Sequence, residues 1–109
     1  MLDEQQFRLY CDQALESLNK ALARPSEELE FDADLGNGTL KIEFEQSGTR
    51  FVISPQTPVR QIWVSAHSKS FKLDWNPDRQ AFTLPEGETL AELIARQISQ
   101  EVGEPITLS

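Results

Sequence analysis

The spacing of apolar residues changes twice along this chain, and that change limits the possible folds more than any other feature of the sequence. Over residues 7–22, apolar side chains recur at steps of three and four, which is the period of one face of an α-helix. Over residues 29–84 the step is two, as in strands with one buried face. The helical period returns over residues 90–102. The sequence therefore predicts a helix, a set of antiparallel strands and a second helix.

The ends of the first helix are marked by residues that start and stop helices. Asp3, followed three residues later by Gln6, forms a capping box. We expect the helix to end near Ala23, because the residue before Pro25 disfavours helical backbone. Cys11 lies within the apolar stripe, which predicts a buried structural thiol. Since it is the only cysteine, an intramolecular disulfide is excluded.

The second helix has a capping box of its own, formed by Thr89 and Glu92, and Gly103 provides a C-terminal cap. Residues 105–108 form a short apolar tail that we expect to lie against the body of the protein. Repeats, linkers and low-complexity tracts are absent from the sequence, so we expect a single domain over residues 1–109.

Between the helices, the alternating pattern predicts five or six strands. The run Gly36-Asn37-Gly38 tolerates positive φ in a tight turn, and residues 54–58 interrupt the pattern with two prolines. Two helices with one apolar face each can cover only one side of such a sheet. The expected fold is therefore an α+β two-layer sandwich with both helices on one face and the other face open to water. The expected strands occupy residues 28–35, 40–45, 50–53, 61–66, 71–75 and 80–84.

Trp63 departs from the burial pattern of its own strand. Ile62 and Val64 fall on the buried side of the alternation, whereas Trp63 falls on the polar side with Gln61. A large apolar side chain is thus predicted on the open sheet face. Either a neighbouring long side chain covers it in part, or it anchors a partner, since tryptophan is favoured in binding hot spots. Trp75, in contrast, is expected in the core.

Residue combinations for catalysis are nearly absent, and we predict no catalytic residues. His67 is the only histidine, and we expect it to be exposed in a turn. Ser-His-Asp and Cys-His arrangements therefore lack the partners that they need. Gly-rich nucleotide-binding motifs and zinc-binding motifs are also missing from the sequence.

The chain is strongly acidic, since 18 Asp and Glu against 10 Lys and Arg give a formal net charge of −8. Such a surface repels nucleic acids and anionic membranes, so neither is an expected partner. No apolar run in the sequence approaches the roughly 18 residues of a membrane span. The first residues lead directly into helical periodicity without a signal peptide, which predicts a cytoplasmic protein.

Carboxylates concentrate in two places and form a candidate metal site. Four of them would stack along one strand face at intervals of about 6.6 Å, and two would share an outward helix face. Their oxygen atoms suit hard cations such as Ca²⁺, Mg²⁺, Mn²⁺ or iron. The alternative is a charged edge strand that keeps the protein soluble and blocks aggregation. The candidate ligands are Glu28, Glu30, Asp32 and Asp34 on the strand and Asp12 and Glu16 on the helix.

Five segments of the chain resemble the frataxin family in their order and spacing, and the length resembles that of its bacterial members, the CyaY proteins. The segment that contains Trp63 is the most specific of the five. The segments are Asn37–Phe44, Gln56–Pro58, Gln61–Ser65, Asp74–Trp75 and Gly87–Ile94.

The resemblance implies a frataxin-like α-β-α sandwich that binds iron weakly through an acidic ridge. It also implies contact with the cysteine desulfurase and the scaffold protein of iron–sulfur cluster assembly, as an accessory or regulatory protein. A monomer is expected, which iron could assemble into oligomers. By position, the ridge would contain Glu28, Glu30, Asp32 and Asp34. The partner-facing sheet would carry Asn37, Gln61 and Trp63.

Two other functions stay open at this point. Some frataxins are described as ferroxidases, which would require Fe²⁺ and oxygen to meet at paired carboxylates. The chain could also be an acidic adaptor that needs no metal. Family members usually carry acidic residues near the end of the first helix, so the ridge is thinner in this chain. The residues found there are Asn19, Lys20, Ala23 and Arg24.

Overall fold

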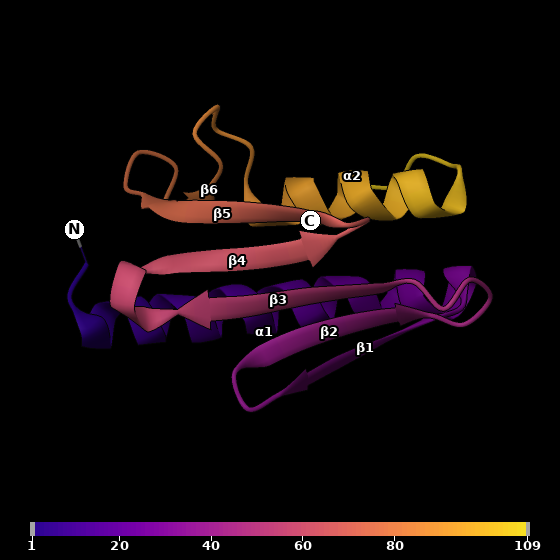
Figure 1. The fold of residues 1–109 in the computed structure, drawn as a ribbon, viewed down its shortest axis with the longest axis horizontal. Helices are drawn as coiled ribbons and strands as arrows, with labels where there is room; N and C mark the ends of the chain where they lie inside the picture. The colour runs from indigo at the N-terminus through magenta and orange to yellow at the C-terminus, as the bar shows by residue number, and fades with distance from the viewer. Residues whose placement is uncertain (1, 109) are drawn as a thin grey trace.

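The computed structural model describes residues 2–108, which form two layers, a sheet and a pair of helices (Figure 1). Met1 and Ser109, the ends of the expected domain, lie outside the described residues. One helix precedes the strands and the other follows them, as predicted. The elements are α1 (Glu4–Leu29), β1 (Phe31–Gly36), β2 (Thr39–Phe44), β3 (Arg50–Gln56), the 3₁₀ helix η1 (Thr57–Val59), β4 (Gln61–Ala66), β5 (Lys69–Asn76), β6 (Ala81–Thr83) and α2 (Leu90–Val102).

The six strands form one antiparallel sheet in which each strand pairs with the next one along the chain, from β1 to β6. In Figure 1 both helices lie behind the sheet, and the opposite sheet face is turned toward the viewer. The predicted α+β two-layer fold, with both helices on one face, is therefore confirmed.

The core lies between the helices and the sheet. The first helix buries every third or fourth residue, the second helix buries a broader face, and β2 and β4 bury alternate residues. Phe7 of α1 meets Phe82 of β6 edge to face, with ring centroids 5.8 Å apart. The apolar tail packs on the same core through Ile106 and Leu108, as expected. Within residues 2–108, no helix combines the length and the apolar content that crossing a bilayer requires.

The local signals at the helix ends and at the first turn are confirmed. Asp3 Oδ1 accepts the backbone N–H of Gln6 at 2.8 Å, which closes the first capping box. Thr89 and Glu92 form the second capping box. Asn37 has left-handed backbone with φ 54°, as the tight turn between β1 and β2 requires.

The first helix is longer than predicted. It runs through Pro25 to Leu29, whereas the proline signal predicted an end near Ala23. The proline ring removes one backbone N–H and crowds the preceding turn. However, Leu22 and Leu29, on either side of the proline, both pack on the core. Tertiary packing thus overrides the local stop signal, and the helix ends only at Glu30, whose φ is 57°.

The predicted strand with four stacked carboxylates is wrong in its first half. β1 begins at Phe31, because α1 occupies the residues before it. Glu28 therefore lies in the last turn of α1, and Glu30 lies in the helix cap. Of the four predicted carboxylates, only Asp32 and Asp34 belong to a strand, and both are exposed. The period of two was misleading here because the last helical turn happens to continue it.

The third strand is also longer than predicted, because residues 54–56 continue β3 instead of ending it. Pairing with β2 stops at Ile53, whereas pairing with β4 continues to the last residue of β3. Pro55 thus lies where β3 has a neighbour on one side only, a position in which a strand tolerates the missing N–H. β5 begins at Lys69, two residues earlier than expected, and β2, β4 and β6 end within one residue of their predicted limits.

Candidate functional site

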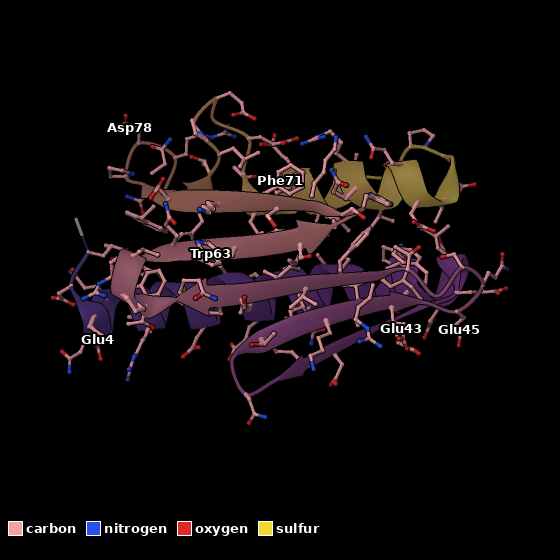
Figure 2. The ribbon with its side chains drawn as sticks, in the orientation of Figure 1. Glu4, Glu43, Glu45, Trp63, Phe71 and Asp78 are labelled. Carbon is pink, nitrogen blue, oxygen red and sulfur yellow. The ribbon has the colours of Figure 1, made fainter. Side chains whose placement is uncertain are left out.

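Trp63 lies on the sheet face that the helices leave uncovered (Figure 2). The residue is 37% exposed, whereas its neighbours Ile62 and Val64 are buried. In residues 2–108 the exposed large hydrophobic side chains are Leu9, Val59 and Trp63, and only Trp63 belongs to the sheet. The indole therefore stands outward, as the alternation in the sequence predicts.

Two polar side chains contact the indole, and a third binds one of them. Trp63 Nε1 donates a hydrogen bond to Gln61 Oε1 at 2.9 Å, and Gln61 Nε2 donates one to Asp74 Oδ1 at 3.2 Å. Lys72 Nζ, on the neighbouring strand, lies 5.0 Å from the centroid of the Trp63 ring, which is a cation–π distance. A long side chain thus covers the indole in part, but more than a third of the residue stays open to solvent.

A shallow hollow of about 210 Å³ adjoins the indole. Its other walls are small or polar side chains of β3, β4 and β5, so the ring is the large apolar surface in it. An exposed aromatic ring beside a hollow can receive a side chain of a partner protein. The residues around the hollow are Val52, Ser54, Trp63, Val64, Ser65, Ser70 and Lys72.

Asn37, the third residue expected to face a partner, lies in the exposed turn between β1 and β2. In the strand order β3 lies between β2 and β4, the strand that carries Gln61 and Trp63. The structure therefore brings Gln61 and Trp63 together and leaves Asn37 at a distance across the sheet.

Trp75 lies on the opposite, helix-covered face of the sheet, as predicted. Its ring stacks on Tyr10 of α1 with centroids 4.4 Å apart and meets Phe82 edge to face at 5.2 Å. Trp75 is half-buried and lines an apolar groove of about 380 Å³ between the two helices. The two tryptophans therefore have different surroundings: Trp75 packs against the core, and Trp63 lies on the surface.

Two of the predicted metal ligands, Glu28 and Glu30, line a hollow of about 300 Å³ where both helices end. Glu101 and Glu104, near the end of α2, line the same hollow. Glu30 Oε2 accepts a hydrogen bond from Gln46 Nε2 at 3.0 Å. Because the C-terminal ends of helices add partial negative charge, the hollow attracts cations. The sequence could not reveal Glu101 and Glu104 as neighbours, since they are distant from Glu28 along the chain.

Asp32 and Asp34 are exposed on the edge strand β1, where their cross-strand neighbours differ. Asp32 lies opposite Glu43, and Asp34 lies opposite Lys41. Glu43 also forms an ion pair with Arg50, with Nη2 and Oε2 2.8 Å apart. One carboxylate therefore faces a like charge, and the other faces a cation.

Asp12 and Glu16 share an exposed face of α1, but the rise of the helix puts them roughly 18–24 Å from Glu28 along its axis. The predicted ligands thus form three separate groups, on α1, at the helix ends and on the edge strand. In residues 2–108 no three Asp, Glu, His or Cys side chains lie close enough to hold a metal ion together. The oxygen donors in these groups are of the kind that hard cations prefer.

His67 is not the exposed turn residue that the sequence predicted. Its side chain is only 27% exposed, and its ring nitrogens lie 2.8 Å from Gln97 Oε1 and 2.9 Å from Glu101 Oε1. The hydroxyl of Ser47 donates a hydrogen bond to the same Glu101 carboxylate at 2.7 Å. These contacts tie two turns of the sheet to the end of α2, and they form only when distant parts of the chain meet.

A family model described as a frataxin-like domain matches residues 1–104. The iron-sulfur cluster assembly protein CyaY of Ralstonia nicotianae is 29% identical over 109 residues, which cover 98% of this chain and 95% of that protein. The CyaY protein of Azotobacter vinelandii is 34% identical over 83 residues, covering 73% of this chain and 74% of its own. The mitochondrial frataxin of Arabidopsis thaliana is 38% identical over 81 residues, covering 72% of this chain and 43% of that protein.

A solved structure has the same fold. The frataxin of Psychromonas ingrahamii matches with a TM-score of 0.79 over 99% of both chains, at 20% sequence identity. At that identity the match concerns the fold alone, and it agrees with the arrangement of two helices and six strands described above.

Proposed function

This chain belongs to the frataxin family, in its bacterial CyaY branch, and from this membership we propose that it takes part in iron–sulfur cluster assembly. Its role is that of a binding protein. The open sheet face around Trp63 contacts the cysteine desulfurase and the scaffold protein, and surface carboxylates hold iron weakly. The names of the CyaY relatives support the role in cluster assembly. The observation that carries the partner contact is the exposed indole on an uncovered sheet face.

The partner contact can be tested by measuring how tightly the protein binds the cysteine desulfurase of the same organism. A buried aromatic anchor is worth about 2 kcal/mol or more, so Trp63→Ala should weaken binding roughly 30-fold or more. Leu9→Ala is the matched control, because it removes another exposed apolar side chain, 53% exposed, from the helical layer. Normal binding by Trp63→Ala, or an equal loss in both variants, would reject the contact.

Iron is proposed as a weakly held cargo. The candidate ligands are all carboxylates, whose oxygens suit Fe²⁺. The hollow lined by Glu28 and Glu30 is open to solvent, and Glu30 already accepts a hydrogen bond from Gln46. We therefore expect a dissociation constant in the micromolar range or weaker, about −8 kcal/mol at most. Binding of this kind weakens as salt screens the charges.

Nuclear magnetic resonance with Mn²⁺ as a paramagnetic probe can locate this site. Signals of residues 28–34 and 101–104 should broaden first, and added salt should reverse the broadening. Broadening centred on Cys11, a buried thiol in the first half of α1, would contradict a carboxylate site.

Two further measurements separate this role from the alternatives that the sequence left open. A protein that only holds iron should not speed oxygen uptake beyond the rate of Fe²⁺ in buffer alone, whereas a ferroxidase should raise that rate in proportion to the amount of protein. A metal-independent adaptor should bind the desulfurase equally well with and without Fe²⁺. Oxygen uptake and desulfurase binding, each measured over a range of Fe²⁺ concentrations, therefore distinguish an iron-holding accessory protein, a ferroxidase and a metal-independent adaptor.

A further inference from the structure

Asp74 lies at the end of a row of hydrogen bonds that reaches Trp63. Gln61 and Asp74 face each other directly across β4 and β5, and Trp63 follows two residues after Gln61 on the same sheet face. The indole Nε1 donates to Gln61 Oε1 at 2.9 Å, and Gln61 Nε2 donates to Asp74 Oδ1 at 3.2 Å. One amide thus connects a carboxylate of β5 to the exposed indole of β4.

The carboxylate of Asp74 decides which way the amide of Gln61 points. An ionised carboxylate only accepts hydrogen bonds, so the NH₂ group of the amide must lie on its side. The amide oxygen then faces the indole of Trp63, whose N–H only donates. The reverse orientation would place two donors together at the indole and two acceptors together at Asp74. The chemistry at both ends therefore selects a single amide orientation.

Lys72 contacts the face of the same indole. It lies directly opposite Trp63 in the register of β4 and β5, with Nζ 5.0 Å from the ring centroid. The hydrogen bond to Gln61 fixes the edge of the ring, and the ammonium group lies over its face. The indole is therefore oriented before any partner arrives, although the residue is 37% exposed.

We propose that Asp74 is a positioning residue of the partner-binding face, which orients Trp63 through Gln61 and does not itself touch the partner. This inference rests on the proposed role of Trp63 as a partner anchor. A side chain that is ordered in advance loses less conformational freedom on binding. Loss of this ordering should weaken partner binding by about 3-fold to 10-fold, which is the usual cost of immobilising one side chain.

The indole N–H resonance of Trp63 tests the positioning without any partner. In Asp74→Ala this resonance should move upfield and exchange faster with water, in the direction seen for Gln61→Ala, which deletes the acceptor itself. Asp78→Ala is the matched control, because it removes an exposed carboxylate from the turn between β5 and β6 (Figure 2). Asp74→Asn keeps an acceptor oxygen and should restore part of the shift. An unchanged Trp63 resonance in Asp74→Ala would overturn the proposal.

Binding to the cysteine desulfurase of the same organism tests the consequence. Asp74→Ala should weaken binding by about 3-fold to 10-fold, which is less than the effect of Trp63→Ala. Added to Trp63→Ala, it should cause no further loss, because Asp74 acts only through the indole. A double variant that binds more weakly than Trp63→Ala would mean that Asp74 contacts the partner, and it would overturn the proposal. If Trp63→Ala binds normally, the partner role fails, and the indole resonance still decides whether Asp74 positions Trp63.

Discussion

The Nε2 atom of His67 lies 2.9 Å from Oε1 of Glu101, although the two residues are 34 positions apart. The other ring nitrogen, Nδ1, lies 2.8 Å from Gln97 Oε1. Oxygen atoms on both sides favour a ring that carries a proton on each nitrogen. The hydrogen bond to Gln97 raises the pKa of His67 above its ordinary 6.5, and the hydrogen bond and charge of Glu101 raise it further against the opposing effect of burial.

A raised pKa in the folded state means that protonated His67 stabilises the fold. This contribution is complete below the ordinary pKa of 6.5 and is lost as the pH rises through the higher pKa of the folded protein. For Glu101, burial alone would raise the pKa, but hydrogen bonds from Ser47 and His67 hold it below 4.5. The contribution of Glu101 is therefore lost only in acid, outside the range in which His67 titrates.

The free energy of unfolding should consequently fall as the pH rises above 6.5, by an amount that His67→Asn does not show. Asparagine is the suitable replacement because it accepts the left-handed backbone at this position, where φ is 52°. Urea unfolding at several pH values measures the difference between the two proteins. A proton-resonance titration that puts the pKa of His67 at or below 6.5 would contradict this account.

Most of the fold is predictable from the sequence because its signals are local. A capping box depends on residues three apart, and the alternation around Trp63 depends on residues two apart, so both can be read from a short segment. The end of α1 cannot be read in this way. The helix continues past Pro25 because Leu22 and Leu29 pack on the core, which is built largely from strands that follow the helix in the sequence.

The candidate site was predictable only in part, for the same reason. The outward position of Trp63 follows from its own strand, but the contact of Gln61 with Asp74 depends on the register of two strands. His67 has hydrogen-bond partners only because α2 ends beside its turn. The sequence pattern wrongly predicts a strand at Glu28, because the last turn of α1 continues the alternation of β1.

Cys11 should react slowly with thiol reagents in the native protein. It is 2% exposed on the buried stripe of α1, and burial, together with the charge of Asp12, raises its pKa to about 12. The thiol therefore lacks both access and thiolate character. Labelling in native buffer should be slow and should become fast and complete in urea. Fast labelling in native buffer would contradict the buried position of this residue.

The two aspartates of β1 should respond differently to neutralisation. Asp32 lies opposite Glu43, so Asp32→Asn removes a like-charge contact and should raise the free energy of unfolding by about 0.5 kcal/mol. Asp34→Asn is the matched control, because Asp34 lies opposite Lys41 and its loss should be neutral or slightly destabilising. Urea unfolding at low and high salt measures the free energy of unfolding of both variants. High salt should reduce the difference between them, because it screens the charges. Equal effects of the two variants would show that the cross-strand charges do not matter here.

The two tryptophans should differ strongly when each is truncated to alanine. Trp75 packs on Tyr10 and Phe82, so Trp75→Ala should lower the free energy of unfolding by about 2–4 kcal/mol. Trp63→Ala removes a ring that is already 37% exposed, and the loss should be about 1 kcal/mol or less. Circular dichroism is the appropriate probe of urea unfolding, because each variant changes the tryptophan fluorescence.

Binding of the cysteine desulfurase should rank the same two variants in the opposite order. Trp63→Ala loses the exposed anchor, whereas Trp75→Ala keeps the open sheet face intact as long as the protein stays folded. The comparison is therefore made at a temperature and urea concentration at which circular dichroism shows both variants to be native. If Trp63→Ala unfolds as easily as Trp75→Ala, the ring serves packing rather than recognition. If Trp75→Ala binds as poorly as Trp63→Ala while folded, the loss of binding is not specific to the open sheet face, and the assignment of the partner contact to that face fails.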